Sequence, residues 1–225
     1  MNTPSKSRTD SRDTILGRVR SATSATANPA GLAEAYSNLL RPYVRAGRMS
    51  PAERVALMIE RLREYDADVV ETSPGGLEAA ITAQLKSSGK TRFVAPEGLP
   101  DAWMSDEFDW KIDRDLGAAE IETCEGVVTG SFCGIADSGT IVLHHSAFEG
   151  RRVISLLPDW HLCVLAASRV VETLPEYFAR CEQPPVLATY ISGPSATADI
   201  EMTRIKGVHG PRFLNVIMVQ DFGSD

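Results

Sequence analysis

Apolar side chains recur in this sequence with two different spacings, and each spacing predicts a different kind of element. The helical spacing is clearest at Val55, Met58, Ile59 and Leu62. Just before them, Ser50 can cap a helix, Pro51 suits its first position, and Glu53 can complete a capping box. The pattern therefore predicts a helix that begins at residue 51.

Short apolar blocks bounded by glycine and polar turns predict strands further along the chain. The predicted order is strand, helix, strand and a short irregular piece, at residues 67–71, 73–89, 91–96 and 99–110. The sequence from residue 118 to 171, including Arg-Arg-Val-Ile-Ser-Leu-Leu at 151–157, is β-rich. A helix at 174–181, a strand at 186–191, another helix after the 192–196 loop and a last strand at 213–219 complete the prediction. This order indicates an α/β protein with a three-layer sandwich.

The first 30 residues are rich in Ser, Thr, Ala and Asn, which predicts a mobile N-terminal arm. Within them, Ile15, Leu16 and Val19 share one helical face, so the arm can contain a short helix. Residues 31–48 also look helical, with a kink or an end at Pro42. We expect residues 31–225 to form a single domain.

Composition and charge exclude several classes of partner. The chain has 225 residues, 43% of them apolar, and a net charge of −7. Without a basic block it is not expected to bind nucleic acid or an anionic membrane surface. No apolar run approaches the roughly 20 residues of a membrane span, and no secretory signal is visible.

The cysteines and histidines predict no metal site in this chain. Its four cysteines, at positions 124, 133, 163 and 181, form no Cys-x-x-Cys pair, so no zinc or iron–sulfur site is indicated. They are expected to be reduced thiols of a cytoplasmic protein. His144 and His145 are adjacent, so in a regular strand they point to opposite faces. His161 begins a buried strand and is expected to be structural.

The segment Gly-Ile-Ala-Asp-Ser-Gly-Thr-Ile-Val-Leu at 134–143 predicts two strands joined by a turn. One interpretation is a plain hairpin turn. The other is a ligand loop, in which Gly139 leaves room beside the backbone while Asp137 and Thr140 offer polar contacts.

The segment Ser-Gly-Pro-Ser-Ala-Thr-Ala-Asp-Ile-Glu at 192–201 is a stronger candidate for binding. Ser192 or Ser195 can cap the helix predicted after it, Gly193 lets a ligand approach, and the helix N-terminus attracts an anion. Asp199 works against a dianion there. The alternative interpretation is a capped corner.

Two further positions are candidates for acid–base chemistry. His209 stands between Gly207 and Gly210, near the last strand, and can serve as an acid or simply occupy a turn. Glu125 or Asp137 can supply a catalytic carboxylate. We expect the 134–140 turn, the 192–196 loop and His209 to meet in one crevice at the carboxyl ends of the strands.

The motifs at 134–143, 151–165, 189–201 and 207–219 together resemble, in order and spacing, the LUD-domain, or lactate-utilisation protein C, family. The resemblance implies a fold similar to the NagB/RpiA/CoA-transferase-like α/β/α sandwich. It also implies a bacterial subunit of lactate-to-pyruvate oxidation whose partner subunits carry the iron–sulfur clusters, with no cofactor in this chain. Asp137 departs from the family, which often has Glu there.

Two functions from different classes follow. In the first, the chain is an accessory subunit that binds a small anionic metabolite or organises its partners. Its pocket would be lined by Asp137, Gly139, Thr140, Ser192, Gly193, Ser195 and His209. In the second, it is an autonomous enzyme of the sugar-phosphate isomerase or CoA-transferase class, with Glu125 or Asp137 as base or nucleophile and His209 as acid. A regulatory ligand-binding protein is a third possibility.

Overall fold

The computed structural model describes residues 8–23, 29–183, 185–197, 205–206 and 210–222. It divides the chain into two compact units, residues 1–43 and 44–225. The first unit contains α1 (Arg8–Thr23), which includes the predicted apolar face, and α2 (Pro29–Ser37). The second helix ends before Pro42, at which a helix was expected to kink or stop.

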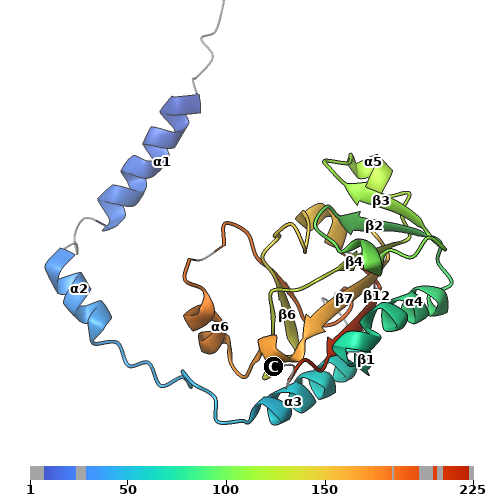
Figure 1. Cartoon of the computed structure of the whole chain (residues 1–225). Coiled ribbons are helices and arrows are strands. Elements are labelled where there is room, and N and C mark those ends of the chain that lie inside the picture. The colour runs from blue at the N-terminus through green and yellow to red at the C-terminus, as the bar shows by residue number, and fades with distance from the viewer. Residues whose placement is uncertain (1–7, 24–28, 184, 198–204, 207–209, 223–225) are drawn as a thin grey trace, which may run out of the picture. The chain divides into compact units, whose positions relative to one another are not determined.

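The second unit is built on a six-stranded sheet in which every pairing is parallel (Figure 1). In order across the sheet the strands are β1 (Asp68–Thr72), β12 (Phe213–Val219), β7 (Trp160–Ala166), β4 (Gly126–Thr129), β2 (Arg92–Pro96) and β3 (Asp109–Asp113). Together with the helices on its two faces, this sheet confirms the predicted α/β class.

Alternate residues of the central strands divide the core between the two faces of this sheet. On one face, Leu162 and Ile217 pack with Ile81 of α4 (Leu77–Ser87). On the other, Cys163 and Val216 pack with residues of α3 (Pro51–Glu64). The sheet is therefore the middle layer of the unit.

Helix α3 begins as its sequence predicts. The Ser50 hydroxyl accepts a hydrogen bond from the Glu53 amide, and the Glu53 carboxylate accepts one from the Ser50 amide. All four predicted apolar positions of this helix are buried.

A second, four-stranded sheet shares the face covered by α3. Its order is β8 (Val170–Val171), β5 (Cys133–Ile135), β6 (Thr140–Leu143) and β9 (Thr189–Ile191). Strand β6 pairs antiparallel with both β5 and β9, and Ile141 and Leu143 belong to the α3 core. The predicted hairpin at 134–143 is thus formed, and it lies in this smaller sheet.

The remaining elements are short. They are η2 (Pro74–Gly76), η3 (Asp101–Trp103), α5 (Ala118–Ile121), η4 (Arg152–Ser155), η5 (Ala167–Arg169), α6 (Leu174–Arg180), β10 (Ala196–Thr197) and β11 (Ile205–Lys206).

Three local predictions for residues before β7 are wrong. Residues 152–155 form a helical turn rather than a strand, because Ile154 packs over the sheet against Val94. Residues 118–121, which were expected to belong to the β-rich region, form a helical turn. Residues 109 and 110, which were expected to be irregular, begin the edge strand β3.

The helix predicted after the 192–196 loop is also not formed at its start, because Ala196 and Thr197 pair antiparallel with Lys206 and Ile205. Helix propensity is a weak preference, and here tertiary pairing overrides it.

Candidate functional site

The turn between β5 and β6 packs against helix α3. Gly139 has a φ of +59°, and a Cβ there would lie 2.6 Å from the Cβ of Arg61. The glycine is therefore required by the turn and by its close approach to the helix. Asp137 is exposed, and its amide donates to the carbonyl of Glu172 (3.0 Å).

The turn and the 192–196 loop meet through hydroxyl groups. The Thr140 hydroxyl lies 2.8 Å from that of Ser138 and 2.7 Å from that of Ser192. Pairing of β6 with β9 sets this contact, because Ile141 stands opposite Ile191. The structure thus joins two of the three segments that were expected to meet, whereas His209 and Asp199 lie outside the described residues.

Gly193 is required by packing. Its φ is +84°, and a Cβ there would lie 2.5 Å from the Cβ of Tyr65, just after α3. Ser195 follows it, and its amide donates to the carbonyl of Pro211 (2.8 Å). The loop thus turns a corner on α3 while facing a pocket on its other side.

We call this pocket, of about 320 Å³, the serine pocket. Its walls include Arg152, Ser155, His161, Ser192, Gly193, Ser195, Gly210 and Pro211. It lies near the amino ends of β7 and β12, since His161 and Leu214 border it. The expectation that this loop sits at the carboxyl end of a parallel strand is wrong, because β9 belongs to the smaller sheet and pairs antiparallel.

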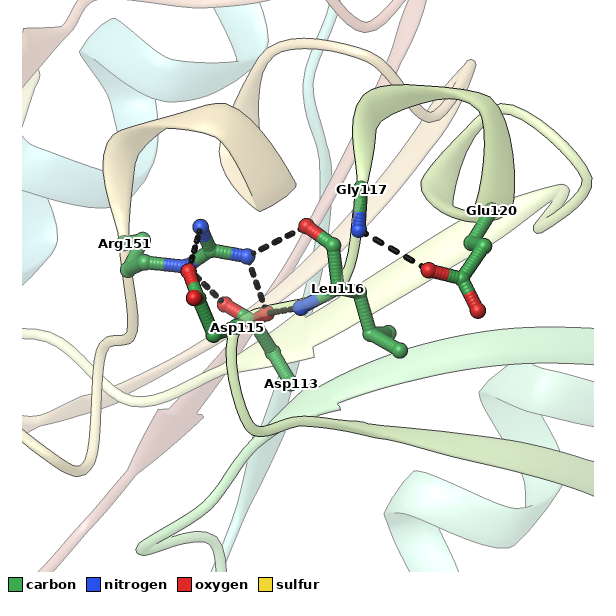
Figure 2. A network of polar contacts seen from close by, with 6 residues as sticks. All are labelled: Asp113, Asp115, Leu116, Gly117, Glu120 and Arg151. Atoms are coloured by element: carbon green, nitrogen blue, oxygen red, sulfur yellow. Dashed lines mark hydrogen bonds and ion pairs between the residues drawn. The ribbon is translucent and has the colours of Figure 1, made fainter.

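Arg151, next to the pocket, is held by a network of acceptors (Figure 2). Its guanidinium donates two hydrogen bonds to Asp113, one to Asp115 (3.0 Å) and one to the carbonyl of Leu116 (2.8 Å). The Leu116 amide also donates to Asp113 (3.2 Å).

The carboxylate of Asp113 in this network is buried. Burial acts to raise the pKa of Asp113, but the hydrogen bonds and charge of Arg151 and the Leu116 amide outweigh it and lower the pKa. Arg151 therefore fixes the start of the 152–155 turn.

Arg152 contrasts with its neighbour. Its side chain is exposed, lines the serine pocket, and makes no ion pair or hydrogen bond with any described residue. An unpaired guanidinium beside serine hydroxyls suits an anionic ligand. The sequence offered no signal for this residue, because Arg151 and Arg152 lie in one segment that was interpreted as a strand.

His161 forms the buried wall of the serine pocket. Its Nε2 lies 2.8 Å from the Thr129 hydroxyl, and burial lowers its pKa to about 4. It is therefore neutral at pH 7 and structural, as its position predicts.

Glu125 lies apart from the serine pocket. Its carboxylate accepts hydrogen bonds from the amides of Thr91 and Arg92 (both 3.1 Å), and these bonds lower its pKa. It borders a separate hollow near the amino ends of β2 and β4, together with Lys90 and Asp159. The structure thus gives Glu125 a structural tie to β2.

His144 and His145 are each used in hydrogen bonds. His145, with a φ of +57°, contacts the Gly150 carbonyl and the Thr189 hydroxyl through its two nitrogens. His144 contacts the Tyr177 hydroxyl through Nε2 (2.9 Å). Within the described part of the chain, no three His, Cys, Asp or Glu side chains are grouped to hold a metal.

The cysteines are free thiols, and three of them are buried. Burial raises the pKa of both Cys133 and Cys163 to about 12, so these two are protonated at neutral pH. Among the described helices, none has the length and apolar character required to cross a bilayer.

Comparison with known proteins agrees with the resemblance noted in the sequence. The LUD domain model matches residues 58–219. Lactate utilization protein C of Deinococcus radiodurans is 37% identical over 184 residues, covering 80% of this chain and 86% of its own. Lactate utilization protein C of Bacillus subtilis is 27% identical over 232 residues, covering 93% and 96%.

A solved structure supports the same assignment. The crystal structure of a DUF162 family protein from Deinococcus radiodurans is 33% identical, with a TM-score of 0.64 over 77% of this chain and all of that one. On this match and the domain model, the chain belongs to the LUD-domain family.

Proposed function

We propose that this protein acts in the bacterial utilisation of lactate, as an accessory subunit that binds a small anionic metabolite. The observation that carries the proposal is its similarity to proteins named lactate utilization protein C over most of both chains. We place this role in the cytoplasm, in keeping with the four free thiols.

The serine pocket is the proposed site for the metabolite. Arg152 supplies a guanidinium that has no partner among the described residues, and a carboxylate is its natural bidentate acceptor. The hydroxyl of Ser192 can donate to a remaining oxygen of a hydroxy or keto acid, whereas that of Ser155 already donates to the Arg152 carbonyl (3.0 Å) and can accept from a ligand hydroxyl. A volume of about 320 Å³ is at the lower end of small-molecule sites. Thr140 belongs to the proposal through its hydroxyl contact with Ser192, and Asp137 and Gly139 lie on the turn that precedes it; His209 lies outside the described residues.

Electron transfer in the proposed complex belongs to partner subunits that carry iron–sulfur clusters. Supporting this, Cys133 and Cys163 lie inside the core with protonated thiols, where they are poor ligands. We expect the purified chain to be colourless and to hold no stoichiometric iron or zinc after dialysis against a chelator. Elemental analysis tests this, and retained metal at one ion per chain would contradict it.

The enzyme alternative has less support. Glu125 is occupied by two backbone amides, and its lowered pKa makes it a weak base. Asp137 is exposed to water at a hairpin turn. Neither carboxylate lines the serine pocket or stands opposite a general acid among its described residues.

The deciding experiment is complementation. A bacterium that lacks its own lactate utilization protein C and cannot grow on L-lactate is given the wild-type chain, Arg152→Ala or Arg114→Ala. Arg114 is the matched control, since it is an exposed arginine outside the pocket. We expect growth with the wild type and the control, and none or little with Arg152→Ala. Failure of the wild type to restore growth would overturn the proposed pathway.

Calorimetric titration separates the ligand from the pathway. The wild type should bind L-lactate or pyruvate, and Arg152→Ala should bind at least about tenfold more weakly, because a charge-assisted hydrogen bond contributes about 1.5–3 kcal/mol. Equal affinity of the two proteins would remove the metabolite from this pocket and leave the lactate role intact.

A further inference from the structure

A second pocket, which the proposed function does not use, lies at the opposite end of the large sheet. Its volume is about 540 Å³. Ser131 and Phe132 follow the end of β4, Ala166 and Val219 end β7 and β12, and Trp103 follows β2. We call it the carboxyl-end crevice. Open parallel sheets bind ligands at this edge, where neighbouring strands connect in opposite directions.

The loop from His144 to Gly150 is seated on this edge by two glycines. The amide of Gly98, after β2, donates to the carbonyl of Ala147 (2.9 Å), and that of Gly130, after β4, donates to the carbonyl of Phe148 (3.1 Å). A Cβ on Gly98 would lie 2.7 Å from the Ala147 oxygen, and one on Gly130 would overlap the Phe148 ring. The loop is therefore a fixed wall of the crevice.

This loop carries a buried carboxylate into the crevice. Glu149 is 3% exposed and lines the cavity. Its Oε2 accepts hydrogen bonds from the amides of His144 and Ser146 (2.5 and 3.4 Å). Its Oε1 has no hydrogen-bond partner among the described residues. Since Glu149 lines the cavity, this second carboxylate oxygen is free to accept a hydrogen bond from a ligand there.

His144 lines the same cavity and stacks on Phe132, with ring centroids 3.6 Å apart. Burial lowers the pKa of His144 and so favours the neutral ring. Nε2 of His144 lies 2.9 Å from the Tyr177 hydroxyl, which also accepts a hydrogen bond from the Tyr190 hydroxyl (3.2 Å).

Aromatic rings and a cation complete the crevice. Trp103 and Phe148 meet edge to face with centroids 5.1 Å apart. Arg169 is exposed and lines the crevice, and it donates one hydrogen bond to the carbonyl of Phe132 (3.3 Å). Flat apolar walls suit a ring, a carboxylate oxygen suits a hydroxyl or amino donor, and a guanidinium suits an acid.

We propose that the carboxyl-end crevice is a second binding site, for a planar ring compound that carries a hydroxyl or amino group and an acidic group. The donor binds Oε1 of Glu149, the acid binds Arg169, and the ring lies against Phe132, Phe148 and Trp103. Lactate and pyruvate have no ring, so this ligand is distinct from the metabolite of the serine pocket.

The test uses two matched probes, hydroxynaphthalene sulfonate and naphthalene sulfonate, with quenching of tryptophan fluorescence as the readout. The full-length wild type should bind the hydroxylated probe at least about tenfold more tightly, because a hydrogen bond to a charged group contributes about 1.5–3 kcal/mol. In Glu149→Gln the amide oxygen can keep the two backbone bonds while its NH₂ replaces Oε1 as a donor. An aryl hydroxyl accepts a hydrogen bond more weakly than it donates one to a carboxylate, so the preference for the hydroxylated probe should be largely lost. Arg169→Ala should weaken both probes alike.

Two controls locate the site. Trp103→Phe should remove most of the quenching, since Trp103 is the tryptophan that borders the crevice. Glu97→Gln changes an exposed glutamate outside the crevice and should change nothing. Equal wild-type affinity for both probes, a preference that survives in Glu149→Gln, or full quenching in Trp103→Phe would overturn the proposal. If circular dichroism shows Glu149→Gln unfolded, the exposed Arg169 decides, and unchanged affinity in Arg169→Ala overturns it.

Discussion

The serine pocket and the carboxyl-end crevice offer opposite chemistry. In the first, the charge is a cation, since Arg152 faces hydroxyl groups and has no partner among the residues described. In the second, the buried charge is an anion, since Glu149 is held by backbone amides within aromatic walls. The first suits a small acid, and the second suits a larger ring with a donor.

Both charges belong to one short segment of chain. Glu149 and Arg152 lie on either side of Arg151, whose guanidinium is held by Asp113, Asp115 and the Leu116 carbonyl (Figure 2). The difference between the pockets therefore depends on a single anchor, which holds the chain as it passes from one end of the sheet toward the other. Variants that move this anchor or one pocket alone can test this arrangement.

The largest effect should come from Arg151→Ala. The variant leaves the carboxylate of Asp113, whose side chain is 1% exposed, without its cation. We expect the free energy of unfolding to fall by about 3 kcal/mol, measured by urea denaturation, and both pockets to lose their probes. Arg152→Ala is the matched control and should change stability by less than about 0.5 kcal/mol. Equal stability of the two variants would show that Arg151 does not anchor the segment between the two pockets.

The same anchor has a pH signature. The pKa of Asp113 is lowered in the folded protein, so its contribution is complete above the unfolded value near 4 and is lost as pH falls through the lower folded value. Stability of the wild type should therefore decline in this acidic range, and Arg151→Ala should decline less.

The next effect concerns the serine pocket alone. Gly193→Ala places a side chain at a φ of +84° and within 2.5 Å of the Tyr65 Cβ, so we expect a loss of about 2 kcal/mol. Gly89→Ala is the control, because its φ is +68° but a Cβ there meets nothing within 4 Å. It should cost about 1 kcal/mol. If thermal unfolding shows a larger loss of stability for Gly89→Ala than for Gly193→Ala, the side chain of Tyr65 moves aside at little cost.

His161 gives the pocket its own pH dependence. The folded pKa of His161, about 4, lies below its unfolded value. Between pH 6.5 and 4 this histidine therefore binds a proton in the unfolded chain but not in the folded one. Stability should fall as pH decreases through this range, by at most about 1.4 kcal/mol per pH unit. His161→Gln should flatten the curve, and an unchanged slope in urea titrations would contradict the assignment.

The smallest effect should come from Ser192→Ala. It removes one hydroxyl from the Ser138, Thr140 and Ser192 chain, while Thr140 keeps its bond to Ser138. We expect a loss of about 0.5–1 kcal/mol in chemical denaturation. A loss of several kcal/mol would mean that this chain of hydroxyls, rather than the packing of Gly193, holds the loop.

Local signals in the sequence predicted the elements whose structure they control. The capping box at Ser50 and the apolar run at 213–219 are local signals for a helix and a strand, and both elements are formed as predicted. The segment after Pro194 lacks such a signal, and its pairing with residues 205–206 depends on contacts that no local propensity reveals. The same is true of the turn at 152–155, whose Ile154 is buried by distant strands.

The two pockets also differ in how far the sequence could predict them. Residues 189–196 form one continuous wall of the serine pocket, so a quoted motif could point to Ser192 and Ser195. The crevice takes single residues, such as Trp103, Phe132 and Glu149, from separate parts of the chain, and no motif contains them. Arg152 escaped notice because only the network around Arg151 tells the two arginines apart.

The order of strands in the large sheet has a consequence for how the protein is made. Strand β12 lies between β1 and β7, and Asn215 donates to Asp68 across 147 residues of sequence. During synthesis, β1 leaves the ribosome long before the strand that will cover its edge. Until β12 arrives, β1 and β7 each present open backbone groups to other chains. Closure of this sheet is therefore a late, long-range step, and nascent chains that stall before residue 213 should depend on chaperones to avoid aggregation.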